Sequence, residues 1–195
     1  MTSLSGGSKE LQALAAEIEA CRRCELHAER LKVVPGAGSA EADVLFIGEG
    51  PGAQEDEAGL PFVGRSGQLL DELLQGVGLD RDKVFITNVV KCRPPGNRAP
   101  RVDEVRACRE YLSRQLEVIR PLLVVTLGRF AMELFVSNGR ISEIHGQPRH
   151  RDGMVTLPLY HPAAALYRRS LQSVVREDFE RIPELLTDLK QRPST

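Results

Sequence analysis

One stretch decides the fold that we predict for this chain: Val44-Leu45-Phe46-Ile47-Gly48-Glu49-Gly50-Pro51-Gly52. Its first four residues are apolar and rich in β-formers, which predicts a buried strand. The glycines and the proline that follow predict an abrupt turn, in which the backbone can approach a ligand closely. Glu49 is the only carboxylate of the turn, and open α/β sheets bind ligands at the carboxyl ends of their strands. Since glycine-rich turns also connect strands without any chemistry, this stretch alone indicates a site only weakly.

Strand-like and helix-like patterns alternate along the rest of the chain. We expect strands at 44–47, 84–87, 122–127 and 154–159, and helices near 11–18, 66–78, 101–119, 128–135 and 173–190. This alternation predicts an α/β fold, a three-layer αβα sandwich around a central, mostly parallel sheet of about four strands. Because parallel strands end at one edge of the sheet, we expect Glu49, Asn88, Gly128 and His161 to meet along a single crevice.

Composition indicates one globular domain. The chain has 195 residues, of which 42% are hydrophobic and 27% charged. We expect a flexible tip at 1–10, a single domain at 11–190 and a tail at 191–195. The polar amino terminus shows no signal peptide, so a cytoplasmic location is expected. The net charge of −1 excludes a uniformly basic nucleic-acid binder, although Lys91, Arg93, Arg98, Arg101, Arg106 and Arg109 form a positive run that is either a solvated face or a local phosphate-binding surface.

The four cysteines have a metal-like spacing, C-x2-C at Cys21 and Cys24 and C-x15-C at Cys92 and Cys108. Two disulfides are disfavoured, because cytosolic reductants keep thiols reduced. Four thiolates can hold zinc or a 4Fe-4S cluster, and the spacing alone does not separate these two. Buried unpaired cysteines are the remaining alternative. Either metal would join the amino-terminal helix to the proline-rich loop after Cys92 and to the helix that carries Cys108.

Several motifs occur together, in one order, over about residues 15–186. They are Gly48-Glu49-Gly50-Pro51-Gly52, Pro61-Phe62-Val63-Gly64-Arg65-Ser66-Gly67, Thr87-Asn88-Val89-Val90-Lys91-Cys92-Arg93-Pro94-Pro95 and His161-Pro162-Ala163. With the four cysteines, they make the chain similar to the iron-sulphur uracil-DNA glycosylases, the family-four, prokaryotic branch of the uracil-DNA glycosylase superfamily. The resemblance implies a monofunctional base-excision-repair enzyme. Such an enzyme flips uracil out of single- or double-stranded DNA, hydrolyses the N-glycosidic bond and leaves an abasic site.

The resemblance also implies residue roles. A structural 4Fe-4S cluster would be held by Cys21, Cys24, Cys92 and Cys108. Asn88 would read the imide edge of the flipped uracil, Phe62 would stack on the base, and His161 would hydrogen bond to the uracil carbonyl as negative charge builds on it. An amide offers one donor and one acceptor to uracil, whereas cytosine would leave buried groups unpaired at a cost of about 1–3 kcal/mol each.

The water-activating group departs from the superfamily pattern. Other branches carry an aspartate at the position of Gly50, so Glu49 is the nearest carboxylate and is expected to position water or substrate. Backbone N–H groups around Gly50 are expected to contact the base. Glu55 resembles the residue whose bulk rejects the methyl group of thymine; a solvent-facing acid is the alternative.

DNA contacts are expected from Ser66 and from the segment after His161, where Leu166, Tyr167 and Arg168 are candidates for the wedge that fills the vacated stack. The expected partners are uracil-containing DNA and free uracil as product, with a sliding clamp as a further candidate, no membrane contact and a monomeric state. Two other functions compete with the glycosylase. One is a metal-stabilised DNA- or nucleotide-binding module without catalysis, favoured by Gly50; the other is an unrelated α/β hydrolase that uses Glu49 and His161.

Overall fold

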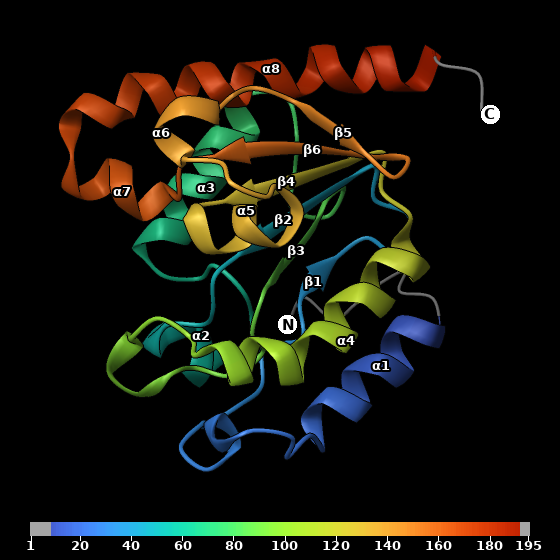
Figure 1. The fold of residues 1–195 in the computed structure, drawn as a ribbon, viewed down its shortest axis with the longest axis vertical. Coiled ribbons are helices and arrows are strands. Elements are labelled where there is room, and N and C mark those ends of the chain that lie inside the picture. Colours follow the sequence, from blue (N-terminus) through green and yellow to red (C-terminus); the bar gives the residue numbers. More distant parts are fainter. Residues whose placement is uncertain (1–8, 192–195) are drawn as a thin grey trace.

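A single twisted sheet forms the centre of the protein, which the computed structural model describes over residues 9–191 (Figure 1). The strand order is β1-β3-β2-β4-β6-β5. The central strands are parallel neighbours, with β3 beside β2, β2 beside β4, and β4 beside β6. The strands are β1 (Ala37–Gly38), β2 (Val44–Gly48), β3 (Phe85–Asn88), β4 (Leu123–Leu127), β5 (Arg149–Arg151) and β6 (Met154–Leu159).

Helices cover both faces of this sheet, as expected for an αβα sandwich (Figure 1). The α-helices are α1 (Lys9–Glu19), α2 (Ala53–Ala58), α3 (Arg65–Gly76), α4 (Val102–Ile119), α5 (Arg129–Phe135), α6 (Ile141–Ile144), α7 (Pro162–Tyr167) and α8 (Gln172–Gln191). Three short 3-10 helices are η1 (Glu25–His27), η2 (Pro95–Asn97) and η3 (Arg169–Leu171). None of the helices within residues 9–191 is long and apolar enough to cross a membrane.

Alternation along the buried strands produces two separate cores. Leu45 and Ile47 of β2 pack in the layer that contains α1 and α4. Val44 and Phe46 point to the opposite layer, where α3, α7 and α8 lie, and the Phe46 ring stacks on Phe179 of α8 with 6.0 Å between centroids. Because successive side chains of a strand point to opposite faces, an all-apolar strand must be covered on both sides. This requirement explains the three layers.

The prediction of four parallel strands is confirmed, but the sheet is larger than expected. The missed strands, β1 and β5, are short and pair antiparallel at the two edges. The sequence Arg149-His150-Arg151 has no apolar run because an edge strand need not bury its side chains. Helix α3 begins at Arg65, one residue before the expected start, and its N-cap is Gly64, so Ser66 lies inside the first turn.

The expected chain ends are only partly described. Lys9 and Glu10 belong to α1, so the helix begins inside the predicted tip, and Gln191 ends α8 inside the predicted tail. The rest of the tip and of the tail lies outside the described residues.

Candidate active site

A cavity of about 460 Å³ opens at the carboxyl ends of β2, β3 and β6. We call it the strand-end cavity. It is lined by Glu49, Gly50, Pro51, Gly52, Glu55, Phe62, Ser66, Asn88, Pro94, Asn97, Arg98, Pro100, His161 and Ala163. The predicted meeting of Glu49, Asn88 and His161 in one crevice is therefore confirmed. Gly128, the fourth residue expected there, does not line the cavity but lies next to His161: a Cβ atom on Gly128 would be 3.1 Å from the Cβ of His161.

Asn88 ends β3 and is in register with Gly48, the last residue of β2. A Cβ atom on Gly48 would lie 2.4 Å from Asn88 Oδ1 and 2.7 Å from Phe62 Cζ. Only glycine at this position therefore leaves room for the Asn88 amide and the Phe62 ring beside the end of β2. The Asn88 side chain is buried, with 2% of the residue exposed. Within residues 9–191 no protein group hydrogen bonds to its amide. Because the amide lines the cavity and keeps its donor and acceptor unused by the protein, it is suited to bind a polar ligand.

Phe62 is held in an unusual backbone conformation beside the amide. Its φ of 52° lies in the left-handed region, which costs free energy for a residue other than glycine. Arg81 stabilises the conformation by donating hydrogen bonds from Nη1 to the carbonyl of Pro61 at 3.0 Å and from Nη2 to that of Phe62. A Cβ atom on Gly67 would lie 1.8 Å from the Phe62 carbonyl oxygen. The sequence motif around Phe62 thus fixes the direction of an aromatic ring.

His161 is the N-cap of α7 and faces Phe62 across the cavity. The rings stack, with centroids 5.5 Å apart and planes 24° from parallel. Its Nδ1 accepts a hydrogen bond from the backbone N–H of Ala163 at 3.1 Å, so the proton of the neutral ring is assigned to Nε2. Burial lowers the pKa of His161 to about 4, and nearby Glu55 opposes this shift. At neutral pH the residue is therefore an uncharged hydrogen-bond donor.

The two carboxylates of the cavity have different surroundings. Glu49 is half-buried, and burial raises its pKa, with the charge of Arg129 acting in the opposite direction. The carboxylate of Glu55 accepts hydrogen bonds from the backbone N–H groups of Gly52, Val63 and Gly64 at 3.1, 3.0 and 2.9 Å. Glu55 is thus not the solvent-facing acid of the alternative interpretation; it joins the turn after β2 to the turn before α3.

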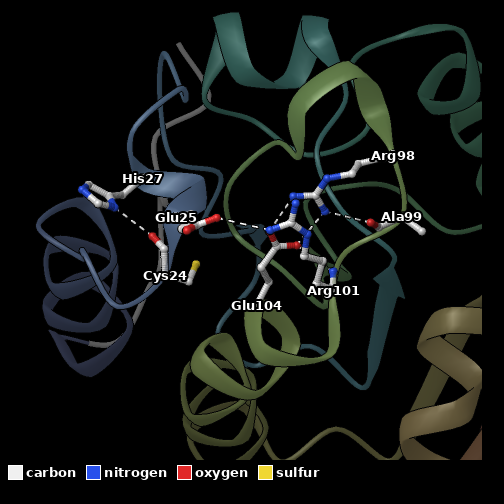
Figure 2. Close-up of polar contacts among 7 residues, drawn as sticks. All are labelled: Cys24, Glu25, His27, Arg98, Ala99, Arg101 and Glu104. Atoms are coloured by element: carbon white, nitrogen blue, oxygen red, sulfur yellow. Dashed lines mark hydrogen bonds and ion pairs between the residues drawn. The ribbon is translucent and has the colours of Figure 1, made fainter.

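A proline-rich loop, residues 93–101, forms part of the wall of the strand-end cavity, and Figure 2 shows how it is anchored. Arg98 Nη1 and Nη2 donate to Glu104 Oε2 and Oε1 at 2.8 and 2.6 Å. Glu104 is 1% exposed, and its hydrogen bonds with Arg98 lower its pKa. Arg101 Nη1 donates to Glu25 Oε2 at 3.2 Å, and Glu25 is the residue that follows Cys24. The wall is therefore tied both to α4 and to the cysteine-bearing segment.

These contacts divide the positive run of residues 91–109. Lys91 is buried, with 1% of the residue exposed, and does not contribute to any surface. Arg98 and Arg101 are engaged in ion pairs. Arg106 and Arg109 are exposed on α4. The run is therefore not one uniform positive face: Lys91 is buried, two arginines are paired with glutamates, and Arg106 and Arg109 are exposed, so a solvated face and a local phosphate-binding surface both stay predictions for these two.

The four cysteines come together as predicted. Cys21, Cys24, Cys92 and Cys108 are all free, and they line a second cavity, the cysteine cavity, between α1, η1 and α4. No disulfide joins any two of these four cysteines in the structure. Backbone and side-chain donors point at the sulfur atoms: Arg30 Nη1 lies 3.1 Å from Cys92 Sγ, and the N–H of Lys91 lies 3.3 Å from Cys108 Sγ.

This donor set fits a thiolate-bound metal group. Soft sulfur ligands select zinc or iron-sulphur clusters, and N–H donors to sulfur stabilise the thiolate form. Within residues 9–191, however, no three His, Cys, Asp or Glu side chains are grouped so as to hold a single metal ion. Around a lone zinc ion all four sulfurs must lie at about 2.3 Å from one centre, whereas a cluster spreads its ligands over several metal atoms.

The residues expected to contact DNA lie in two places. Ser66 lines the strand-end cavity from the first turn of α3. Helix α7 begins at the cavity and ends at Tyr167, which is 84% exposed, and Arg168, its C-cap, is also exposed. Leu166 instead lines a separate cavity between α3 and α8. The Pro162-Ala-Ala-Ala-Leu sequence was an available signal for this helix, since proline favours the first helical position.

Comparisons with known proteins agree with the geometry. The sequence model of the Uracil DNA glycosylase superfamily matches residues 35–190. A type-4 uracil-DNA glycosylase of Archaeoglobus fulgidus is 45% identical over 187 residues, which cover 91% of this chain and 94% of that protein. One from Sulfurisphaera tokodaii is 43% identical over 185 residues, covering 90% and 84%. A type-5 uracil-DNA glycosylase of Pyrobaculum aerophilum is 32% identical over 171 residues, covering 78% and 75%. This chain therefore belongs to the type-4 branch of the uracil-DNA glycosylase superfamily.

Proposed function

We propose that the protein excises uracil from DNA by hydrolysing the bond between the base and deoxyribose, leaving an abasic site. The observation that carries the proposal is the strand-end cavity, in which the Asn88 amide, the Phe62 ring and the Nε2–H of His161 converge. All three groups reach the cavity from the ends of strands or from adjoining turns. They present the stacking surface, the amide and the donor that a flipped pyrimidine requires.

Base recognition is assigned to Asn88 and Phe62. The amide can donate to one uracil carbonyl and accept from the ring N–H, while cytosine would present mismatched groups. With the wrong base bound, buried polar groups of the site would stay unpaired, and the cost of leaving them unpaired makes the site selective for uracil. Glu55 contributes by holding the turns at Gly52 and Val63. Its second role, rejection of the thymine methyl group, stays part of the proposal.

Departure of the base is assigned to His161. Bond cleavage places negative charge on uracil, and a neutral donor at Nε2 stabilises a uracil carbonyl oxygen as this charge develops. The lowered pKa of His161, about 4, keeps the imidazole uncharged over the physiological range. The hydrogen bond from the Ala163 N–H fixes the required tautomer. Helix α3 also begins at the cavity, and its positive amino-terminal end favours a nearby anion.

Attack of water is assigned to Glu49. The sugar becomes oxocarbenium-like during cleavage, so a carboxylate near it can stabilise positive charge and orient the attacking water. Glu49 lines the cavity, and within the described residues no hydrogen bond or ion pair occupies its carboxylate. Gly50 follows it, and the backbone N–H groups of this turn are proposed to contact the base.

DNA is gripped, in this proposal, by Ser66 at the cavity mouth and by the end of α7. Tyr167 is our choice for the wedge, because it is the exposed aromatic residue among the three candidates. An inserted ring can replace the stacking that the flipped base gives up. Arg168, beside it, is assigned to a phosphate. The cytoplasmic location, the monomeric state and a sliding clamp as partner stay predictions.

The cysteine cavity is proposed to hold a 4Fe-4S cluster through Cys21, Cys24, Cys92 and Cys108. When bound, the cluster supplies a structural cross-link and no redox step. Cys92 and Cys108 flank the loop that forms a wall of the strand-end cavity, and Cys24 precedes Glu25, to which Arg101 of the same loop is paired. The residues of this loop would therefore keep their positions through the cluster ligands on either side.

A second function, binding of DNA without catalysis, is favoured by one observation. A Cβ atom on Gly50 would lie 2.8 Å from Val90 Cγ2, so this site is built without room for the aspartate used by other branches. Glu49 must then suffice for positioning water. If Glu49 does not position water, the protein would still bind uracil-containing DNA but would not cleave the glycosidic bond.

The test is excision of uracil from an end-labelled oligonucleotide by the purified protein, followed by cleavage at abasic sites. Matched oligonucleotides with thymine or cytosine at the same position control for specificity, and filter binding of the same DNA measures affinity. We expect abasic product from the uracil strand only. Tight binding without product would favour the binding module instead, and product from all three strands would contradict the recognition role of Asn88.

A further inference from the structure

Lys91 is a buried cation that the proposed reaction leaves without a role. It lies between Asn88, in the strand-end cavity, and Cys92, in the cysteine cavity. Its Nζ is 2.6 Å from Thr87 Oγ1, 2.8 Å from the carbonyl oxygen of Asn88 and 2.7 Å from Gln115 Oε1. Burying a lysine is costly unless its charge is well solvated by protein groups.

The partners define the state of the side chain. The Thr87 hydroxyl donates to the Pro35 carbonyl at 2.8 Å, so its oxygen acts as an acceptor toward Lys91. The other two partners are carbonyl oxygens. Three acceptors require three N–H donors, which only the ammonium form of lysine provides. Gln115 Nε2 donates to the Pro35 carbonyl at 2.7 Å and is thereby fixed with its oxygen toward the ammonium.

These bonds fix the peptide unit that follows Asn88. Its carbonyl oxygen accepts from Lys91 Nζ, and its N–H, which belongs to Val89, donates to Gly48 O at 2.9 Å. With both ends of the peptide unit bound, the backbone of Asn88 cannot rotate freely. The direction in which the Asn88 side chain leaves the backbone is therefore fixed as well. The amide itself has no protein partner within residues 9–191. Its orientation therefore depends on the backbone and on packing.

We infer that Lys91 is a positioning residue for base recognition: its ammonium, held by Thr87 and Gln115, fixes the carboxyl end of β3 so that the Asn88 amide faces the cavity. This inference rests on the proposed function. It assigns no contact between Lys91 and DNA or uracil, because Lys91 is buried, does not line the strand-end cavity and uses all three hydrogens of its ammonium. A small misplacement of a reacting group is known to reduce rates by up to about 100-fold.

The test is a double-mutant cycle on single-turnover uracil excision from a single-stranded oligonucleotide. The variants are Lys91→Met, Asn88→Ala and the double variant, with Lys83→Met as the control for loss of an exposed lysine. We expect Lys91→Met to slow excision roughly 10- to 100-fold without changing DNA affinity. In the Asn88→Ala background the same change should slow excision by less than about 2-fold, because residues that act as one unit are not additive.

Stability is controlled separately. Phe179→Leu reduces packing in the opposite core and should lower the unfolding temperature while excision keeps its rate at a temperature where the variant is folded. If Lys91→Met does not yield folded protein, Gln115 provides the test. Gln115→Glu keeps an acceptor for the ammonium, whereas Gln115→Met removes it, so excision should be slower in the methionine variant; equal rates would overturn the inference.

Two results would separate the inference from the function on which it rests. If the unmodified protein releases no uracil, the proposed function fails and the role of Lys91 fails with it. If the unmodified protein is active but Lys91→Met slows excision by the same factor with and without Asn88, Lys91 acts independently of the amide and the positioning role alone is overturned. A folded Lys91→Met protein that excises uracil at the original rate would also overturn the positioning role alone.

Discussion

The strand-end cavity and the cysteine cavity are separated by only a few residues of chain, from Asn88 to Cys92, but they are organised in opposite ways. In the first, neighbouring groups fix the functional side chains: Gly48 and Gly67 leave space for them, and Arg81 holds the backbone of Phe62. In the second, Cys92 and Cys108 are buried while Cys21 and Cys24 are partly buried, and burial raises the pKa of Cys108 to about 11. Their N–H donors nevertheless favour thiolates. The difference teaches that protein contacts alone arrange the proposed base site, whereas the cysteine cavity gathers sulfur ligands for the metal group that we propose there.

The largest effect is expected from the strand-end cavity itself. Asn88→Ala removes the only amide that we assign to the imide edge of uracil, so single-turnover excision should fall by at least about 100-fold, in the range known for loss of one preorganised donor. Stability should change little, because the amide has no partner inside the described protein. Asn138→Gly, at an exposed turn with a φ of 59°, is the matched control and should keep the original rate. A rate for Asn88→Ala close to that of the control would remove Asn88 from the mechanism.

The next effect concerns stability and the cysteine cavity. Cys108→Ala should abolish absorption near about 400 nm from a thiolate-bound cluster and lower the free energy of unfolding by about 3 kcal/mol or more, because metal binding is coupled to folding. Urea titrations and the spectrum measure both. Leu112→Ala on the same helix is the control: it reduces packing in that core and should keep the absorption. A colourless original protein would contradict the cluster.

A smaller loss of activity is expected from Gly67→Ala. The added methyl group meets the Phe62 carbonyl oxygen, and the loop must move to accept it. We expect an approximately 10-fold slower excision, caused by displacement of the Phe62 ring, at a stability cost of about 1–3 kcal/mol typical of overpacking. Gly76→Ala is the control, since no atom lies within 4 Å of a Cβ there. Equal rates for the two alanine variants would show that the ring position does not limit excision.

The smallest effect is expected from pH. His161, with a pKa near 4, should cause no change in excision rate around pH 6.5, the ordinary value for imidazole. Stability should respond instead: between pH 4 and pH 6.5 the unfolded chain binds a proton that folded His161 excludes, so this residue lowers the free energy of unfolding as pH falls through that window. In His161→Gln the dependence should be shallower. A rate step near pH 6.5 that disappears in His161→Gln would contradict the neutral donor.

Much of the fold followed from the sequence because the central strands are buried on both faces and are mainly apolar. The convergence of Glu49, Asn88 and His161 followed from the rule that parallel strands share a carboxyl edge. The edge strands β1 and β5 were missed because their residues carry no apolar pattern. The family resemblance supplied residue roles that no local pattern contains.

Other features depend on tertiary contacts that a sequence does not display. Lys91 lies among arginines and looks like a surface residue, but Gln115, from a distant helix, makes its burial possible. Glu55 lies in an acidic stretch, and only the folded turns reveal its three backbone partners. In both cases the signal is a charged residue whose partners come together only on folding.

The most direct test of the account is the place where free uracil binds, measured by nitrogen–proton NMR spectra of the labelled protein during titration with uracil. We predict that the side-chain amide of Asn88, the Nε2–H of His161 and the backbone around Phe62 shift together, that signals around the cysteine cavity stay unchanged, and that Asn88→Ala abolishes the shifts. Saturable shifts that persist in Asn88→Ala, or that centre on the cysteine cavity, would contradict the assignment of the strand-end cavity as the base site.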